Sequence, residues 1–99
     1  MDDIARYGAY LANEKNASQN TISSYLRDVT QFAEYLQNTQ SCGLRLATGD
    51  MIRSYMYWMQ GHGKSASSVT RFLASVKSFY NFLVGNRDMK SNPAKGITA

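Results

Sequence analysis

Residues 18–38 read SQNTISSYLRDVTQFAEYLQN, a stretch in which apolar side chains recur at the spacing of one helix face. The apolar positions are Ile22, Tyr25, Leu26, Val29, Phe32, Ala33 and Leu36. They follow the i, i+3, i+4, i+7 pattern of a helix that packs one side against a core. Ser18 precedes this pattern, and a serine oxygen can accept a hydrogen bond from a free amide of the first turn. We therefore predict a long amphipathic helix over 19–38 that is capped by Ser18.

The rest of the chain shows the same signals of helices and of their ends. Helical periodicity recurs at 2–15, 49–60 and 66–84. Thr48 and Ser65 stand where N-caps of the last two helices are needed, and between these helices Gly61 and Gly63 favour a turn because glycine weakens a helix interior. No stretch shows the two-residue period of a strand. The sequence predicts an all-α, four-helix bundle that forms one domain over 1–99.

Length and composition limit the chemistry that the chain can carry. Its 99 residues can bury one core, and 43% hydrophobic residues with a single proline are too apolar for a disordered tail. Cys42 and His62 are the only cysteine and histidine, so the sequence offers neither an internal disulfide nor metal-ligand spacing, and we expect no metal and no cofactor. There is no signal-peptide pattern and no apolar run near the roughly 18 residues of a membrane span. We expect a cytoplasmic protein without a membrane partner.

The charge of the chain is concentrated in its second half. Residues 50–99 contain seven basic and two acidic side chains, whereas residues 1–49 contain four basic and five acidic ones. Basic side chains that neutralise phosphates release condensed counterions, which favours binding to a polyanion. The asymmetry therefore points to a nucleic-acid partner, although basic charge alone does not identify one.

Two of the predicted helices carry polar faces that are poor in acidic residues. On 19–38 the face comprises Asn20, Ser24, Arg27 and Gln31. At the fourth helix it comprises Lys64, Ser67, Ser68, Arg71, Ser75 and Ser78, with Lys77 on its flank. Small hydroxyls allow close approach to a phosphate backbone, and arginine and asparagine reach phosphates and base edges. The alternative is an ordinary solvated surface, which usually mixes lysine with glutamate in i, i+4 pairs.

The same stretches resemble a known family. Residues 20–28, NTISSYLRD, resemble the N-T-x-x-x-Y-x-R-D signature in the N-terminal core-binding domain of tyrosine recombinases, the family of phage integrases and Xer-type proteins. Residues 67–80, SSVTRFLASVKSFY, resemble that domain's later S-x-x-x-R-x-L-x-x-[VL]-[RK]-x-[FL]-[FY] helix. Asn92-Pro93-Ala94 is similar to the point where family members pass into a linker, and it could also start one more helical turn. We expect the linker to begin within 91–99.

The resemblance implies a SAM-like orthogonal bundle that forms one arm of a C-shaped clamp around a recombination half-site, with the second and fourth helices in the major groove. Together with the polar faces it gives ten expected DNA contacts: Asn20, Thr21, Ser24, Arg27, Lys64, Ser67, Ser68, Arg71, Ser75 and Lys77. The implied partners are double-stranded DNA, a C-terminal catalytic domain outside this chain, and the other protomers of a synaptic tetramer. We expect the 99-residue chain itself to be a monomer.

Three positions within these motifs have their own expectations. Tyr25 lies in the apolar stripe, so it either packs in the core with its hydroxyl at the rim or contacts a phosphate. Asp28 would repel phosphate, and we expect it to bond internally to Arg71 or to a backbone amide. Ser78 occupies a position that is often basic in relatives, so a weaker phosphate contact is expected there.

The chain is not expected to be an enzyme by itself. The family's catalytic set is an arginine, a lysine, an H-x-x-R element, a further histidine or tryptophan and a nucleophilic tyrosine, all in the C-terminal domain. His62 is followed by Gly63-Lys64-Ser65, so no H-x-x-R element occurs, and none of the seven tyrosines is expected to act as a nucleophile. We expect the full-length protein to be a recombinase that cleaves and rejoins DNA.

Two other functions compete with a recombinase domain. The short turn between the third and fourth predicted helices suits a helix-turn-helix transcription regulator, which would be a dimer on a palindrome. A helical protein-interaction module would use the methionine and aromatic residues Met51, Met56, Tyr57, Trp58 and Met59. Core packing accounts for most of this second group.

Overall fold

Four α-helices and one 3-10 helix make up the computed structural model, which describes residues 2–99. In chain order they are α1 (Asp3–Asn13), α2 (Gln19–Gln40), η1 (Leu44–Leu46), α3 (Gly49–Gly61) and α4 (Ala66–Gly85). No strand occurs within the described residues. The prediction of an all-α four-helix domain is confirmed, and η1 lies between the predicted helices 19–38 and 49–60.

Polar side chains cap the first turns of the helices, and three of these caps were predicted from the sequence. The hydroxyl oxygens of Ser18, Thr48 and Ser65 each accept a hydrogen bond of 3.1–3.2 Å from the amide three residues later. Asp2 caps α1 in a similar way, because its carboxylate accepts from the amide of Ile4 at 3.1 Å. Each cap satisfies an amide that has no partner within its helix.

The turn between α3 and α4 depends on a glycine. Gly63 adopts φ +79°, a left-handed conformation that strains other residues. The amide of Lys64 then reaches the carbonyl of Met59 at 3.0 Å, and the amide of Gly63 reaches that of Gln60 at 3.2 Å. These two bonds form a Schellman motif, which ends α3 and directs the chain into α4.

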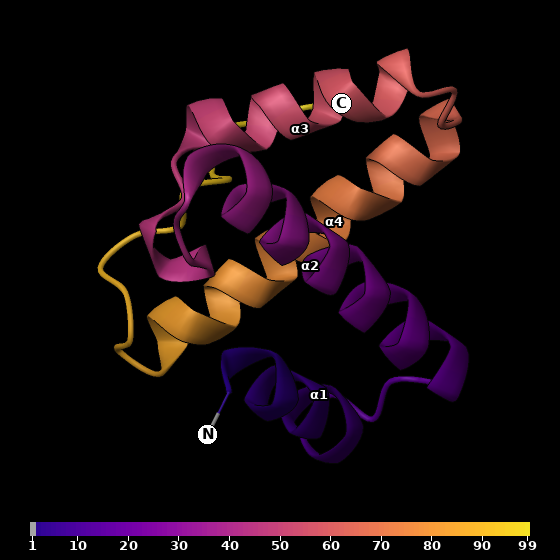
Figure 1. The fold of residues 1–99 in the computed structure, drawn as a ribbon. Coiled ribbons are helices and arrows are strands. Elements are labelled where there is room, and N and C mark those ends of the chain that lie inside the picture. Colours follow the sequence, from indigo (N-terminus) through magenta and orange to yellow (C-terminus); the bar gives the residue numbers. More distant parts are fainter. Residues whose placement is uncertain (1) are drawn as a thin grey trace.

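Helices α2 and α4 cross in the middle of the molecule, with α1 on one side and α3 on the other (Figure 1). An aromatic cluster joins three helices at this crossing. The Phe32 ring centroid of α2 lies 5.3 Å from Tyr55 of α3 and 5.5 Å from Phe72 of α4. On the other side, Tyr7 of α1 lies 5.3 Å from Phe79 of α4. Buried aromatic contacts of this kind fix how the helices cross.

The segment after α4 packs against the bundle. Ala94 is fully buried and Ile97 is 3% exposed, and both belong to the core. The side-chain amide of Asn92 donates to a backbone carbonyl of α4 at 3.1 Å. Residues 91–99 therefore contact the domain over part of their length, while the start of a linker within them remains a prediction.

Asn92 starts one hydrogen-bonded turn, as its sequence allowed, because the amide of Lys95 donates to the carbonyl of Asn92 at 3.1 Å, but no helix follows. Residues 93–96 form consecutive turns instead. The carboxamide oxygen of Asn92 accepts from the amide of Ala94 at 2.8 Å, and Gly96 follows with φ +83°. The left-handed glycine reverses the chain before a helix can propagate.

Four charged side chains tie the start of the chain to η1 and to the segment after α4. Asp3 pairs with Arg45 at 2.8 Å and with Arg6 at 3.1 Å. Arg6 also reaches Asp88 at 2.9 Å. Two of the basic residues are thereby matched by carboxylates and contribute little to the positive field of the domain.

This network predicts a loss of stability in acid. Hydrogen bonding to Arg45 holds the pKa of Asp3 below its usual value, against the opposing effect of burial. Because the folded pKa is lower than the unfolded one, the stabilisation is complete above the usual aspartate pKa of about 3.9 and is lost as pH falls through the lower folded value. We expect the melting temperature of Asp3→Asn to fall less than that of the unmodified protein between about pH 5 and pH 2.

Circular dichroism melts across this pH range measure the effect. Asp50→Asn is the matched control, because Asp50 is 97% exposed and its pair with Arg53 is 3.3 Å long. The control should follow the unmodified protein. Equal acid sensitivity in all three proteins would contradict the assignment.

Within residues 2–99, no helix combines the length and the apolar character that crossing a membrane requires. The same residues contain no group of three histidine, cysteine, aspartate or glutamate side chains arranged to hold a metal ion.

Candidate nucleic-acid interface

A buried ion pair connects α2 with α4. Asp28 of α2 is 4% exposed, and its two oxygens accept hydrogen bonds from Arg71 of α4, Nε at 3.0 Å and Nη2 at 2.9 Å. These bonds raise the pKa of Arg71 further above neutral pH, so its guanidinium stays charged. Of the two internal partners expected for Asp28, Arg71 or a backbone amide, the structure shows Arg71. Arg71 keeps 43% of its side chain exposed, so the pair is buried on the α2 side and open on the α4 side.

Ser75 is part of this buried arrangement, and the prediction that it contacts DNA is wrong. Its side chain has no exposed surface, and its hydroxyl donates to Asp28 Oδ2 at 2.8 Å. Ser78, one turn further along, is half-buried and accepts a 2.7 Å hydrogen bond from the hydroxyl of Tyr7. Both serines lie on the predicted polar face of α4, but α2 and α1 cover that face from this level onward.

The polar residues of α2 lie around the ion pair. Ser24 and Gln31 stand one turn before and one turn after Asp28, so they share the side of α2 that Arg71 approaches. Arg27 is exposed beside them. Thr21, which was expected at the interface, accepts a 2.9 Å hydrogen bond from the capping hydroxyl of Ser18 and is half-buried.

The start of α4 adjoins this side of α2. Lys64 and Ser67 are exposed, and Ser68 is half-buried with its hydroxyl 3.1 Å from that of Ser65. Lys64 and Gln31 line the same groove between α2 and α3. The two polar helix faces therefore form one surface.

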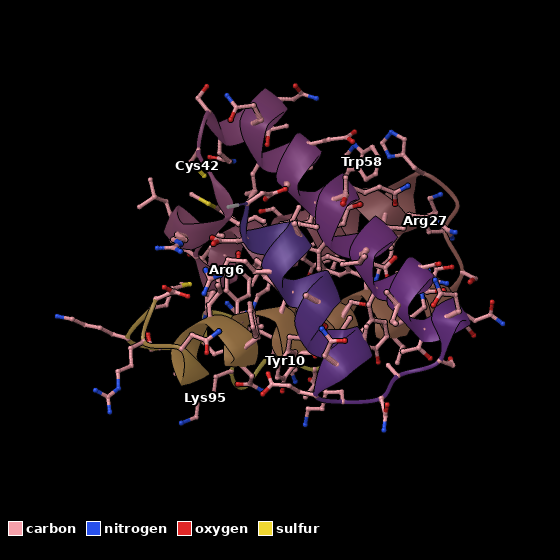
Figure 2. All side chains as sticks on the ribbon, turned by 90° about the horizontal axis from the view of Figure 1, so that it is seen from below. Arg6, Tyr10, Arg27, Cys42, Trp58 and Lys95 are labelled. Carbon is pink, nitrogen blue, oxygen red and sulfur yellow. The ribbon has the colours of Figure 1, made fainter. Side chains whose placement is uncertain are left out.

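We call this surface the α2–α4 face, formed by Asn20, Ser24, Arg27, Gln31, Lys64, Ser67, Ser68 and Arg71. Three of its side chains are basic. Asp28 beside them is buried, and the exposed carboxylate of Glu34 lines the adjoining groove with Gln31 and Lys64. Figure 2 places Arg27 and Trp58 on one side of the molecule, away from Lys95 and Cys42. A short-chained, basic, hydroxyl-bearing surface suits a phosphate backbone and the floor of a groove.

Lys77 is not brought into the α2–α4 face. It follows Arg71 by six residues, which turns it about 240° around the helix. Lys77 instead lines a shallow groove of about 480 Å³ with Lys90 and Lys95, between α4 and the C-terminal segment. The basic residues of the second half of the chain thus divide into two groups.

The methionine and aromatic residues of α3 also divide. Met56 and Met59 are buried and Met51 is half-buried, whereas Tyr57 is 74% exposed and Trp58 is 41% exposed. Core packing therefore accounts for the methionines, which was the expected alternative to an interaction surface.

An aromatic groove borders the α2–α4 face, and the sequence did not reveal it. Trp58 stacks on Tyr55 with centroids 5.6 Å apart and on His62 at 4.2 Å. The groove has a volume of about 390 Å³ and includes Lys64 and Gln31 on its rim. In the sequence, Trp58 was marked only as one of the methionine and aromatic residues of a possible interaction surface.

The tyrosines of the core are held as neutral phenols. Burial raises the pKa of Tyr7 to about 12, and burial also raises the pKa of Tyr80, whose hydroxyl donates to the carbonyl of Leu44 at 2.6 Å. Tyr25 is half-buried and packs against the core, in agreement with one of its two expected environments.

Comparisons with a family model and with known proteins point to the same family. The model of the phage integrase N-terminal SAM-like domain matches residues 4–86. Tyrosine recombinase XerD of Rickettsia prowazekii is 33% identical over 97 residues, which cover 98% of this chain and 31% of that protein. Tyrosine recombinase XerC of Escherichia coli O157:H7 is 31% identical over 102 residues, covering 98% and 33%. XerC of Myxococcus xanthus is 35% identical over 92 residues, covering 93% and 30%.

The chain spans about a third of the length of these relatives. No solved structure matches it. The resemblance seen in residues 20–28 and 67–80 is confirmed, because the family model covers both stretches in order. On this match the chain belongs to the phage-integrase family of tyrosine recombinases and forms its N-terminal SAM-like domain.

Proposed function

We propose that this domain binds double-stranded DNA for a site-specific tyrosine recombinase and holds a recombination half-site against its α2–α4 face. The observation that carries the proposal is the Asp28–Arg71 pair, which joins the polar sides of α2 and α4. Arg27 of α2 and Lys64 before α4 are exposed basic residues of these two sides. The relatives that match the whole domain are named tyrosine recombinases, which supports a role in DNA recombination.

The expected contacts have different tasks in this proposal. Arg27 and Lys64 neutralise phosphates, and Asn20, Ser24, Ser67 and Ser68 let the helices approach the groove closely. Lys77 makes a separate phosphate contact together with the lysines near the C-terminal segment. Thr21 supports the cap of α2 and lies at the rim of the interface.

The remaining parts of the reaction belong to the rest of the protein. We propose that a C-terminal catalytic domain cuts and rejoins the DNA and that other protomers join in the synaptic complex. In this proposal the domain contributes DNA binding and no catalytic residue. Alone it is half of a clamp, so its affinity for DNA is modest. The isolated domain is a monomer in this proposal.

Replacing Arg27 with alanine should weaken DNA binding by about threefold to tenfold at low salt. The loss of one phosphate contact should also reduce the slope of log affinity against log salt by about one. A fluorescence titration of labelled 30-base-pair duplex DNA at several salt concentrations measures both quantities.

Arg53→Ala is the matched control, since it removes the same charge from α3, beside the C-terminal segment and away from the α2–α4 face. Its affinity and salt slope should stay close to those of the unmodified protein. Absence of binding even at low salt, or equal losses in the two variants, would overturn the proposed interface.

A further inference from the structure

Arg71 is held by one edge of its guanidinium and leaves the other edge free. Asp28 accepts from Nε at 3.0 Å and from Nη2 at 2.9 Å, which uses two of the five N–H donors of the side chain. Three donors remain, two on Nη1 and one on Nη2, and one from each nitrogen forms the terminal edge. Because 43% of the side chain is exposed, this edge can meet a ligand.

The buried partners fix the direction of that edge. Asp28 is 4% exposed and cannot swing into solvent, and Ser75, which is fully buried, donates to Asp28 Oδ2 at 2.8 Å. Each carboxylate oxygen is therefore bonded, and the guanidinium plane is set by two parallel hydrogen bonds. Little side-chain entropy remains to be lost when Arg71 binds something.

The charge of the pair decides what that ligand is. The carboxylate of Asp28 cancels the charge of Arg71 at short range and would repel a phosphate placed beside it. A guanine base is neutral and offers two acceptors, O6 and N7, in the major groove, and a terminal guanidinium edge matches them with two parallel bonds. Arg27, exposed and outside this pair, is better suited to phosphate.

We propose that Arg71 reads a guanine in the major groove through its Nη1–Nη2 edge, and that Asp28 and Ser75 are positioning residues that aim it. This inference rests on the proposed function, because it requires α4 to face the major groove. It assigns the phosphate contacts to Arg27 and Lys64 and the sequence-reading contact to Arg71.

Selection from a pool of duplex DNA with randomised central positions tests the inference on the unmodified 99-residue chain. The bound pool should be enriched in guanine at one position. Replacing that guanine by 7-deazaguanine, which lacks the N7 acceptor, should abolish most of the preference. A bidentate contact of this kind corresponds to a preference of roughly 5- to 150-fold over other bases.

Two variants separate base reading from general affinity. Arg71→Lys keeps the charge and a partner for Asp28 but lacks the two parallel donors of the guanidinium, so its affinity for the guanine-containing site should fall much more than its affinity for unselected DNA. Asp28→Asn removes a negative charge, so it should bind unselected DNA more tightly and yet prefer guanine less. A purely structural role of Asp28 would lower both quantities together. Thermal melts of each variant establish that it is folded at the assay temperature.

The outcomes distinguish the two proposals. Binding without a guanine preference, or a preference that survives 7-deazaguanine or Arg71→Lys, overturns the role of Arg71 and leaves the proposed function intact. Failure of the unmodified protein to bind any duplex at low salt overturns both.

Discussion

Replacing Arg71 with alanine should lower the free energy of unfolding by about 3 kcal/mol, far more than an arginine of an exposed helix usually contributes. The reason is that the substitution leaves Asp28 without its ion-pair partner. Asp28 is 4% exposed, so its carboxyl group would be left in a poorly solvated site with only the hydroxyl of Ser75 as a hydrogen-bond partner. An unpaired buried charge costs more than the pair itself contributes.

Urea denaturation of a double-mutant cycle measures this effect. In Asp28→Ala with Arg71→Ala, both charges are absent, and Ser75 can still donate to the carbonyl of residue 71, which lies 3.0 Å away in the unmodified protein. We expect the double variant to lose only about 1 kcal/mol, because removing both partners leaves no unpaired charge.

Arg53→Ala serves as the control for the single variant. Arg53 and its partner Asp50 are 54% and 97% exposed, so this substitution should change stability by less than about 0.5 kcal/mol. Equal losses for Arg53→Ala and Arg71→Ala would show that the Asp28–Arg71 pair is not effectively buried. The expected cost also explains why Arg71→Lys, and not alanine, is the variant suited to DNA-binding measurements.

Replacing Phe32 with alanine should lower the free energy of unfolding by about 4 kcal/mol, a large share of the roughly 5–15 kcal/mol that stabilises a typical domain. Phe32 has no exposed surface and contacts Tyr55 and Phe72, so its removal leaves a cavity where α2, α3 and α4 meet. The same packing sets the crossing of α2 and α4. We therefore expect DNA binding to weaken in proportion to the unfolded fraction.

Urea denaturation followed by circular dichroism measures the loss in Phe32→Ala. Tyr57→Ala is the control, since it removes an aromatic side chain of α3 that is 74% exposed, and it should change stability by less than about 0.5 kcal/mol. A cost for Phe32→Ala as small as that of Tyr57→Ala would mean that the three helices do not share one core.

The Asp28–Arg71 pair links the stability of the domain to its proposed recognition of DNA. One side chain of the pair closes the contact between α2 and α4, and the other remains accessible at the α2–α4 face. A change in how the helices cross would therefore move the donor edge of Arg71. Stability and base preference are measured separately in the experiments above because a single substitution can affect both.

Local sequence patterns were enough to predict the helices, their caps and the family. Periodicity and capping are local properties, so 18–38 predicted α2, and Ser18, Thr48 and Ser65 predicted where three helices begin. The partnership of Asp28 with Arg71 was also foreseen, because a carboxylate among expected phosphate contacts needs an internal partner.

Which residues of each helix face remain accessible depends on where the helices cross. A helical wheel gives the direction of a side chain around its own axis and says nothing of the level at which another helix crosses. Ser75 and Arg71 share one stripe of α4, yet α2 covers Ser75 and leaves Arg71 partly open. The burial of Ala94 and Ile97 depended in the same way on contacts between distant parts of the chain, which no local pattern encodes.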